Sequence, residues 1–194
     1  MKKLSIIAAL GMSALLFSFK IIAPATWTVD KMHAKIGFSI THNMASDVEG
    51  SFKAFDATIT TTGKDFAGSS IDFSADAASI TTDNDHRDKD IKSASFIDVE
   101  KFPKLTFKST AVTRNTASTY KIAGNLTLHG VTKPIILDAF VRTPPAAAGL
   151  KKTVAGFKIS GVIKRADFGI GAGFANVMLG DEITLTANGE FIKN

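Results

Sequence analysis

A chain of 194 residues and 20.6 kDa is long enough for one domain with a full hydrophobic core and too short for two domains of ordinary size. It contains no cysteine, which excludes disulfides, thiolate metal sites and cysteine nucleophiles. Its formal charge is +5, but three of its lysines lie in the first 25 residues, which contain no acidic residue. No cluster of lysine and arginine interleaved with aromatic residues follows, so we expect no nucleic-acid partner.

The N-terminal segment has the parts of a secretory signal. Two lysines precede an apolar run over residues 4–19, and Ala23 and Ala25 occupy the positions that a signal peptidase reads. We predict a signal peptide over residues 1–25 and a mature domain over residues 26–194, with a formal charge of +2, in a periplasmic or secreted protein. The alternative is an uncleaved membrane anchor, although the apolar run is shorter than the roughly 20 residues that span a bilayer.

Apolar residues alternate with polar ones along most of the mature chain. The first such run has Ala34, Ile36, Phe38 and Ile40 at alternate positions. A period of two residues is typical of a half-buried strand. We predict eight strands, over residues 27–42, 48–62, 69–82, 104–114, 119–129, 133–143, 152–165 and 182–193.

Eight antiparallel strands joined in chain order have two exposed edges unless the first strand pairs with the last. We therefore predict an all-β fold, an eight-stranded antiparallel up-and-down barrel. Between strands three and four we predict a long, partly helical loop, with a helical turn over residues 93–98. A barrel of this size holds packed side chains or one small ligand. A sandwich of two sheets is the competing architecture.

In an up-and-down barrel, the connections after strands one, three, five and seven lie at the same rim. Two of these connections are long, over residues 83–103 and 166–181, and connections of such length usually cover or line a site. Three of the four histidines, His42, His86 and His129, also fall at this rim. Exposed rim histidines are the simpler interpretation, because no ligand spacing among them predicts a metal site.

The connection over residues 83–103 begins with charge and ends with apolar residues. Seven of its first ten residues are charged. We predict that it folds over the barrel mouth as a lid, with its apolar residues toward the pore. Arg87 and Asp88 are expected to pair with each other or with Arg165 and Asp167 of the facing loop, where Arg165 continues the inward phase of its strand. Solvated charges of little energetic value are the alternative.

Three segments match a known family in order and spacing: SITTDNDHRDKDIKSASFIDVEKFPKLTFKST, IAGNLTLHGVTKPIILD and GFKISGVIKRADFGI. They resemble the YceI-like proteins, bacterial periplasmic domains that bind polyisoprenoid lipids. The resemblance extends from Trp27 to the C-terminus and implies a lipocalin-like barrel with an isoprenoid chain in its pore. The chain departs from the family at Asp90 and Ile91, where the family has histidine and leucine. This departure concerns the preference for the lipid head group.

We therefore expect binding, with transport or storage, of an isoprenoid lipid, which is a polyisoprenoid, a quinone or a quinone precursor. The alternatives are an enzyme or accessory factor that acts on such a lipid and an interaction module with a filled core. We predict no catalytic residues, no metal site and no cofactor, and we expect a monomer or homodimer that contacts a membrane transiently.

The residues expected to bind the lipid come from the inward strand faces and the long connections, with ordinary barrel core as the alternative role of the wall residues. They are Phe38, Ile40, His42, Phe73, Arg87, Asp88, Phe96, Phe102, Phe107, Leu126, Leu128, Phe157, Ile159, Arg165 and Phe168.

Overall fold

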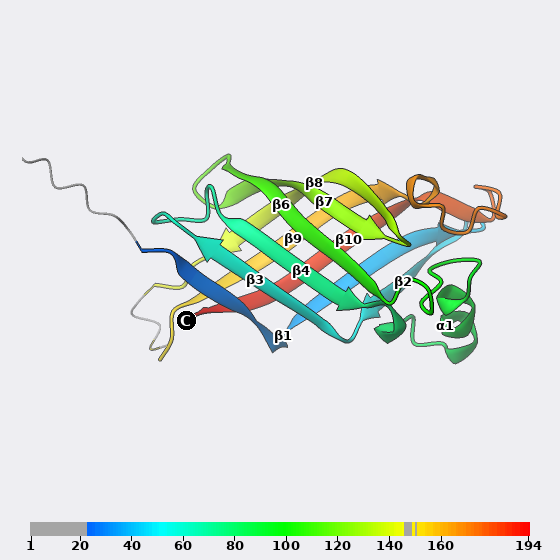
Figure 1. Cartoon of the computed structure of the whole chain (residues 1–194), viewed down its shortest axis with the longest axis horizontal. Helices are drawn as coiled ribbons and strands as arrows, with labels where there is room; N and C mark the ends of the chain where they lie inside the picture. The colour runs from blue at the N-terminus through cyan, green and yellow to red at the C-terminus, as the bar shows by residue number, and fades with distance from the viewer. Residues whose placement is uncertain (1–22, 146–148, 150) are drawn as a thin grey trace, which may run out of the picture.

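A computed structural model describes residues 23–145, 149 and 151–194, so most of the predicted signal segment lies outside the described residues. Antiparallel strands dominate this part of the chain (Figure 1). The strands are β1 (Ala25–His42), β2 (Ser46–Phe52), β3 (Phe55–Thr61), β4 (Ser70–Asp76), β5 (Ile80–Thr81), β6 (Lys104–Arg114), β7 (Thr119–Leu128), β8 (Val131–Arg142), β9 (Val154–Lys164) and β10 (Leu179–Lys193). The helices are α1 (Asp85–Lys92) and short 3₁₀ helices at Ala77–Ser79 and Arg165–Phe168. Within the described ranges, no helix has the length and apolarity needed to cross a bilayer.

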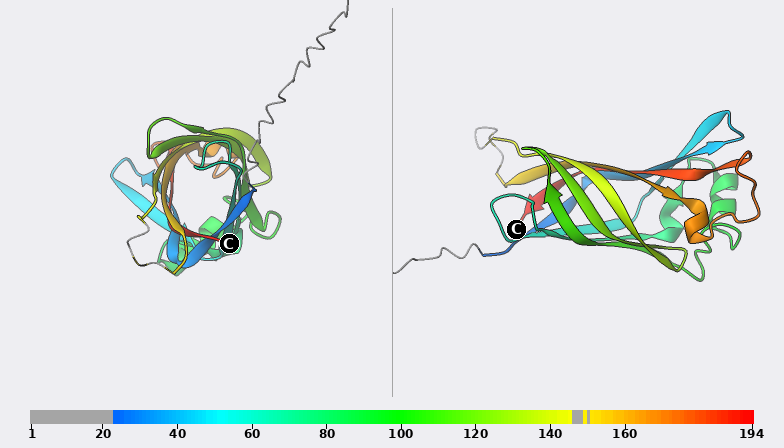
Figure 2. Two further views of the ribbon diagram at one scale, coloured as in Figure 1. Left: turned by 90° about the vertical axis from the view of Figure 1, so that its left-hand side faces the viewer. Right: turned by 90° about the horizontal axis from the view of Figure 1, so that it is seen from above.

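Eight of these strands form a closed wall in chain order, β1, β3, β4, β6, β7, β8, β9 and β10. The last strand pairs with the first, from Trp27 opposite Lys193 to His42 opposite Leu179. Seen along its axis the wall is a ring (Figure 2, left). The predicted up-and-down barrel is confirmed, and the sandwich is excluded because β1 and β10 are neighbours in a single closed sheet.

Two of the predicted strands are each broken in the middle. β2 and β3 fill one predicted strand, and β4 and β5 lie within another. The two breaks face each other, because Lys53 N–H donates to the Ser79 carbonyl (3.2 Å) and Ala54 N–H donates to the Ser79 hydroxyl (3.0 Å). Beyond the breaks, β5 pairs with β2, and in the described part of the chain it does not pair with β6. The wall therefore parts at this rim, where α1 lies (Figure 1).

The helix of the long connection begins earlier than predicted. It is formed by the charged residues 85–92, whereas residues 93–97 form a bend and turns. The Asn84 side chain caps the helix by accepting from Arg87 N–H (3.0 Å). Acidic residues stand in the first turn and lysines in the last, which complements the helix dipole. The predicted partly helical loop is confirmed, but its helix is the charged run, and the prediction of a helical turn over residues 93–98 was wrong.

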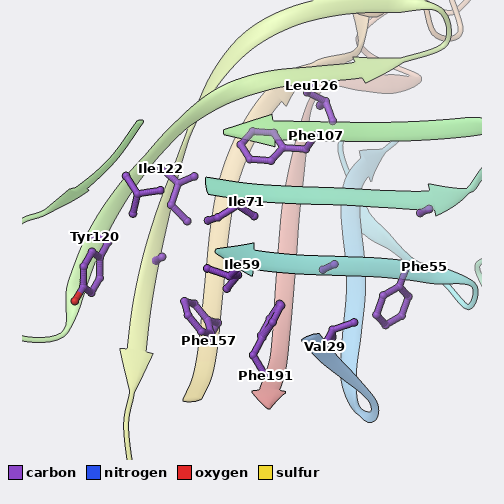
Figure 3. Close-up of a cluster of buried hydrophobic side chains, with 14 of the residues drawn as sticks. Val29, Phe55, Ile59, Ile71, Phe107, Tyr120, Ile122, Leu126, Phe157 and Phe191 are labelled. Atoms are coloured by element: carbon purple, nitrogen blue, oxygen red, sulfur yellow. The ribbon is translucent and has the colours of Figure 1, made fainter. Parts of the chain in front are cut away.

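Aromatic side chains close the end of the barrel opposite α1. Phe66, from the connection between β3 and β4, is only 5% exposed. Its ring centroid lies 5.1 Å from that of Trp27, 4.9 Å from that of Phe157 and 6.5 Å from that of Tyr120. Phe157 in turn packs on Phe191 at 5.2 Å, and Figure 3 shows these two rings side by side. We call these five residues the aromatic plug.

Candidate binding cavity

An apolar cavity of about 610 Å³ occupies the barrel interior. Ligand pockets commonly measure about 300–1,000 Å³, so this volume suits a ligand and not only packed side chains. Every barrel strand contributes to the lining, mostly with aliphatic and aromatic residues. Figure 3 shows the inward direction of several of them, among them Ile59, Ile71 and Phe107. At the plug end the lining includes Phe157 and Phe191.

The wall residues predicted from alternation all face this cavity. They are Phe38, Ile40, Phe73, Phe107, Leu126, Leu128, Phe157 and Ile159. Sequence reasoning left out further lining residues with the same inward phase, including Ile122, Leu137 and Leu185. For Ile122 the alternating pattern contains the signal, because it stands four positions before Leu126, which was already assigned inward. No residue on the strands of Leu137 and Leu185 was assigned inward, so the pattern gave no phase for these two.

Most polar residues of the lining lie at the end of the barrel where the two long connections are found. The exceptions are Thr186 and Asn188 of β10. Those near the long connections come from the end of β1, from α1 and from the turns after α1. They are His42, Arg87, Asp90, Ser93 and Ser95. The cavity thus has an apolar interior and a polar mouth. Asp90, where the sequence departs from the family pattern, is one of the mouth residues.

The residues 82–103, which we call the lid, are anchored at Thr82. The Asp88 carboxylate, 8% exposed, accepts from both the backbone N–H and the hydroxyl of Thr82, each at 2.6 Å. Arg87 donates to the Thr82 hydroxyl oxygen (2.7 Å) and carbonyl (3.0 Å). Burial acts to raise the pKa of Asp88, but hydrogen bonds from Thr82 and Thr81 and the charge of Lys92 lower this pKa below its ordinary value. Asp88 therefore holds α1 against the end of β5 and does not line the cavity.

Arg165 is buried, at 3% exposure, but it points into its own loop instead of the cavity. We call residues 165–178 the rim loop. The guanidinium donates six hydrogen bonds of 2.7–3.2 Å to that loop and the start of β10. The acceptors are the carbonyls of Ile170, Gly171, Phe174, Leu179 and Gly180 and the side-chain oxygen of Asn176.

The predicted pairing of Arg87, Asp88, Arg165 and Asp167 is therefore wrong. Among the described residues, no ion pair joins any of these four side chains to another. Asp167 is exposed, and the two arginines use backbone carbonyls and Thr82 or Asn176 as acceptors. Backbone carbonyls are present at every residue, so no sequence pattern marks such partners.

Phe102 and Phe168 also lie outside the cavity lining. Phe102 packs its ring against His129, with centroids 5.0 Å apart. Phe168 is 1% exposed, and its carbonyl accepts from His129 Nδ1 at 2.9 Å. Both phenylalanines fix the turn between β7 and β8, which contains His129, to the neighbouring loops. Of the three rim histidines, only His42 lines the cavity.

The lid and the rim loop meet over the cavity mouth. Phe96 of the lid packs against Phe174 of the rim loop with centroids 5.1 Å apart, and both line the cavity. Gly171 N–H donates to the Ser95 carbonyl (3.1 Å). Figure 1 and the right view of Figure 2 place α1 and the rim loop at the same end of the barrel. The mouth is covered by contacts between two segments that are far apart in the sequence.

In the part of the chain that the structure describes, one histidine and carboxylate group has atoms close enough to hold a metal ion. Asp30, His33 and Glu190 place their ligand atoms within 4.8 Å of one another. His33 Nδ1 and the Asp30 carboxylate are 2.9 Å apart, and this hydrogen bond raises the pKa of His33. The group lies at an irregularity of β1 and not in the cavity lining.

A closed antiparallel barrel with an apolar cavity, plugged at one end and covered at the other, has the architecture of the lipocalin-like binding proteins. The model of the YceI-like domain matches residues 27–191. The chain belongs to this family.

Relatives and solved structures agree with the family. A UPF0312 protein of Yersinia pestis (strain Pestoides F) is 35% identical over 186 residues, which cover 95% of this chain and 96% of that protein. The crystal structure of the Campylobacter jejuni YCEI protein has a TM-score of 0.70 and 30% identity, covering 77% of this chain and 86% of that chain. A polyisoprenoid binding domain from Saccharophagus degradans has a TM-score of 0.69 at 15% identity, covering 89% and 100%, which shows a shared fold.

Proposed function

We propose that this protein binds an isoprenoid lipid in the barrel cavity and transports or stores it in the periplasm. The observation that carries the proposal is the apolar cavity of about 610 Å³ with polar residues gathered at its mouth. A prenyl chain would lie among the inward aliphatic and aromatic side chains, and a polar head group would lie near His42, Arg87 and Asp90. The structural neighbour that is a polyisoprenoid binding domain supports this ligand class.

Binding in the cavity would be driven by the removal of the apolar prenyl surface from water. Burial of apolar surface contributes about 25 cal/mol per Å², and a long prenyl chain has several hundred Å² to bury. Packed side chains alone would leave no such volume, since protein interiors contain few voids larger than a water molecule. The cavity therefore favours a carrier over a module with a filled core.

Binding without catalysis is supported by the use of the two buried charged groups at this end, Asp88 and Arg165. Arg165 donates all its hydrogen bonds to the rim loop and β10, and Asp88 accepts from Thr82. These groups hold the two covering segments in place. Neither of them lines the cavity, whereas a catalytic role would need them directed at the reacting atoms of the ligand.

The test is solvent extraction of protein purified from its native periplasm, followed by mass spectrometry of the extract. We expect ions spaced by isoprene units. Delipidated protein should melt at a lower temperature than loaded protein, because a ligand that binds only the folded state shifts the unfolding equilibrium. Extracts with only ordinary phospholipid, together with unchanged melting after delipidation, would contradict the proposal.

Periplasmic location has its own test, which is N-terminal sequencing of the native protein. We expect the mature chain to begin at Thr26, which leaves the buried Trp27 in β1. A native chain that begins at Met1 would instead mean a retained anchor and a tethered protein.

A further inference from the structure

Four large apolar side chains are exposed together at the cavity mouth, and we call them the collar. They are Met44 (76% exposed), Phe174 (38%), Val177 (59%) and Met178 (51%). Met44 stands at the turn between β1 and β2, and the other three belong to the rim loop. The two segments are joined by a hydrogen bond from Asn43 N–H to the Met178 carbonyl (2.9 Å). The collar includes half of the eight large apolar side chains exposed in the described part of the chain, so they are not randomly scattered.

The collar is continuous with the cavity. Phe174 and Met178 are exposed to solvent on one side and line the cavity on the other. An apolar path therefore runs from the outer surface past these two side chains into the barrel. Exposed apolar patches on a soluble protein mark sites of interaction, and this patch leads directly to the binding cavity.

The local structure holds the collar outward. Arg165 donates to the carbonyls of Phe174 and Leu179 and to the Asn176 side chain, which fixes the backbone on both sides of Val177 and Met178. The rim loop therefore cannot fold these side chains inward without breaking the hydrogen bonds of a buried guanidinium.

Met44 occupies an unfavourable backbone conformation for its size. Asn43 and Met44 have φ of 52° and 54°, and Ala45 N–H donates to the His42 carbonyl (3.0 Å), as in a type I′ turn. The second position of such a turn favours glycine. A large apolar residue at this position does not stabilise the turn, and its side chain is exposed to solvent.

We propose that the collar docks on the surface of a lipid bilayer, and this proposal rests on the proposed lipid-binding function. A prenyl lipid that leaves the bilayer would then pass Phe174 and Met178 into the cavity without crossing water. Docking of this kind buries apolar side chains in the interface between head groups and acyl chains. The bilayer is the favoured partner because the ligand class resides there and because the collar borders the ligand cavity.

The charged residues around the collar indicate whether it prefers a neutral or an anionic bilayer surface. Residues 41–49 contain two acidic residues and no lysine or arginine, and the lid contains six acidic and four basic residues. Residues 165–182 contain three acidic residues and one arginine, which is buried. Apolar contact must therefore dominate, and anionic lipids should repel this rim.

The experiment is flotation of the lipid-loaded mature protein with phosphatidylcholine vesicles. We expect binding that changes less than about twofold between about 0.05 and 0.5 M salt, because phosphatidylcholine has no net charge for the rim to attract or repel. Vesicles with about one third phosphatidylglycerol should bind more weakly at the lower salt concentration, and added salt should restore binding.

Met44→Gly and Val177→Ser test the collar itself, since neither residue lines the cavity. Each should weaken vesicle partitioning by about fivefold to tenfold, from the loss of one inserted apolar side chain. Met44→Gly should leave the melting temperature unchanged or higher, because glycine suits the turn. The matched control is Met32→Ser. Met32 is 90% exposed and lies on β1 ten residues before His42, away from the rim, so this variant should partition as the wild type does.

The docking proposal is overturned if the wild type does not bind phosphatidylcholine vesicles, or if the two collar variants bind as well as Met32→Ser. It is also overturned if the collar variants abolish self-association in solution without affecting vesicles, since the collar would then cover a second copy. Bound lipid is measured in every variant. If the collar variants lose vesicle binding but extracts of the protein contain no isoprenoid, the result supports docking on a bilayer and contradicts the proposed ligand.

Discussion

The two ends of the barrel are closed by different kinds of contact. The aromatic plug is made of five buried rings, each no more than 7% exposed. The mouth is closed by the lid and the rim loop. The rim loop is held by the hydrogen bonds of Arg165 and by Phe168 and Ile170, which belong to the main core. The lid is held by the hydrogen bonds of Thr82 and by two ring contacts, Phe96 with Phe174 and Phe102 with His129. The plug thus depends on apolar burial, whereas the lid depends mostly on polar anchors.

This difference indicates which end opens. Segments with few buried apolar contacts open locally at a small fraction of the global unfolding free energy. In the lid and its neighbour β5 the buried apolar residues are Ile80 and Ile97, whereas the plug rings belong to the main core. We therefore expect the mouth to open for ligand exchange while the plug stays closed, and the following predictions test this asymmetry.

The largest effect is expected from Phe66→Ala at the plug. Removing a buried phenylalanine should lower the free energy of unfolding by about 3–5 kcal/mol, from lost transfer energy and the remaining cavity. Urea unfolding measures this change. Phe140→Ala, which truncates a ring 37% exposed on β8, is the control and should cost well under that amount. Equal losses in the two variants would mean that Phe66 contributes no more to packing than a partly exposed ring, and would contradict the role of the plug.

Arg165→Met should lower the free energy of unfolding by about 3 kcal/mol, because it leaves six oxygen acceptors without their donor. The loss should be the same with and without bound lipid, since Arg165 does not line the cavity. Arg165→Lys keeps the charge, and its free energy of unfolding should lie between that of the wild type and that of Arg165→Met. Wild-type stability combined with loss of bound lipid would instead assign Arg165 to the head group.

Thr82→Val should loosen the lid and leave the barrel intact. It removes the hydroxyl that donates to Asp88 and accepts from Arg87, at a local cost of about 1–3 kcal/mol. Hydrogen exchange of the α1 amides should accelerate, while amides of β7 and β9 keep their protection. Thr132→Val, at an exposed threonine pair on the outer face, is the control. Uniform acceleration across the barrel would show that lid and wall unfold together.

The smallest effect is the pH dependence of the lid anchor. The pKa of Asp88 is lowered from its ordinary value of 3.8, so its stabilising contribution is fully present above that value and is lost as pH falls through the lower folded pKa. Below pH 3.8 we expect α1 amides to lose protection before the fluorescence of Trp27 in the plug changes. Asp88→Asn should remove this step. A fluorescence change that precedes lid opening would reverse the proposed order of the two ends.

Much of the fold follows from patterns of short range. Alternation predicts the strands and the inward residues, and strand order predicts which connections share a rim. The breaks at Lys53 and Ala77–Ser79 could not be predicted in this way, because they depend on hydrogen bonds between two strands. The position of α1 could have been predicted, since Asn84 before an acidic start and a basic end is a helix signature.

The cavity-lining residues of the barrel strands could be predicted from the sequence, but the contacts of the loops could not. Phe66 lies in a polar connection whose sequence resembles an ordinary turn, and only the folded barrel brings it to Trp27 and Phe157. The inward phase of Arg165 correctly predicted its burial. Its acceptors are mostly backbone carbonyls, which have no sequence signature, so the predicted acidic partners were wrong.

The most direct test of the account is native mass spectrometry of two tryptophan variants on β1. Ile36 faces the cavity and Lys35 beside it is exposed, so Ile36→Trp fills the cavity and Lys35→Trp is the matched control. We expect one bound lipid in the wild type and in Lys35→Trp, and little or none in a folded Ile36→Trp. Equal lipid content in all three proteins would place the lipid outside the cavity and contradict the account.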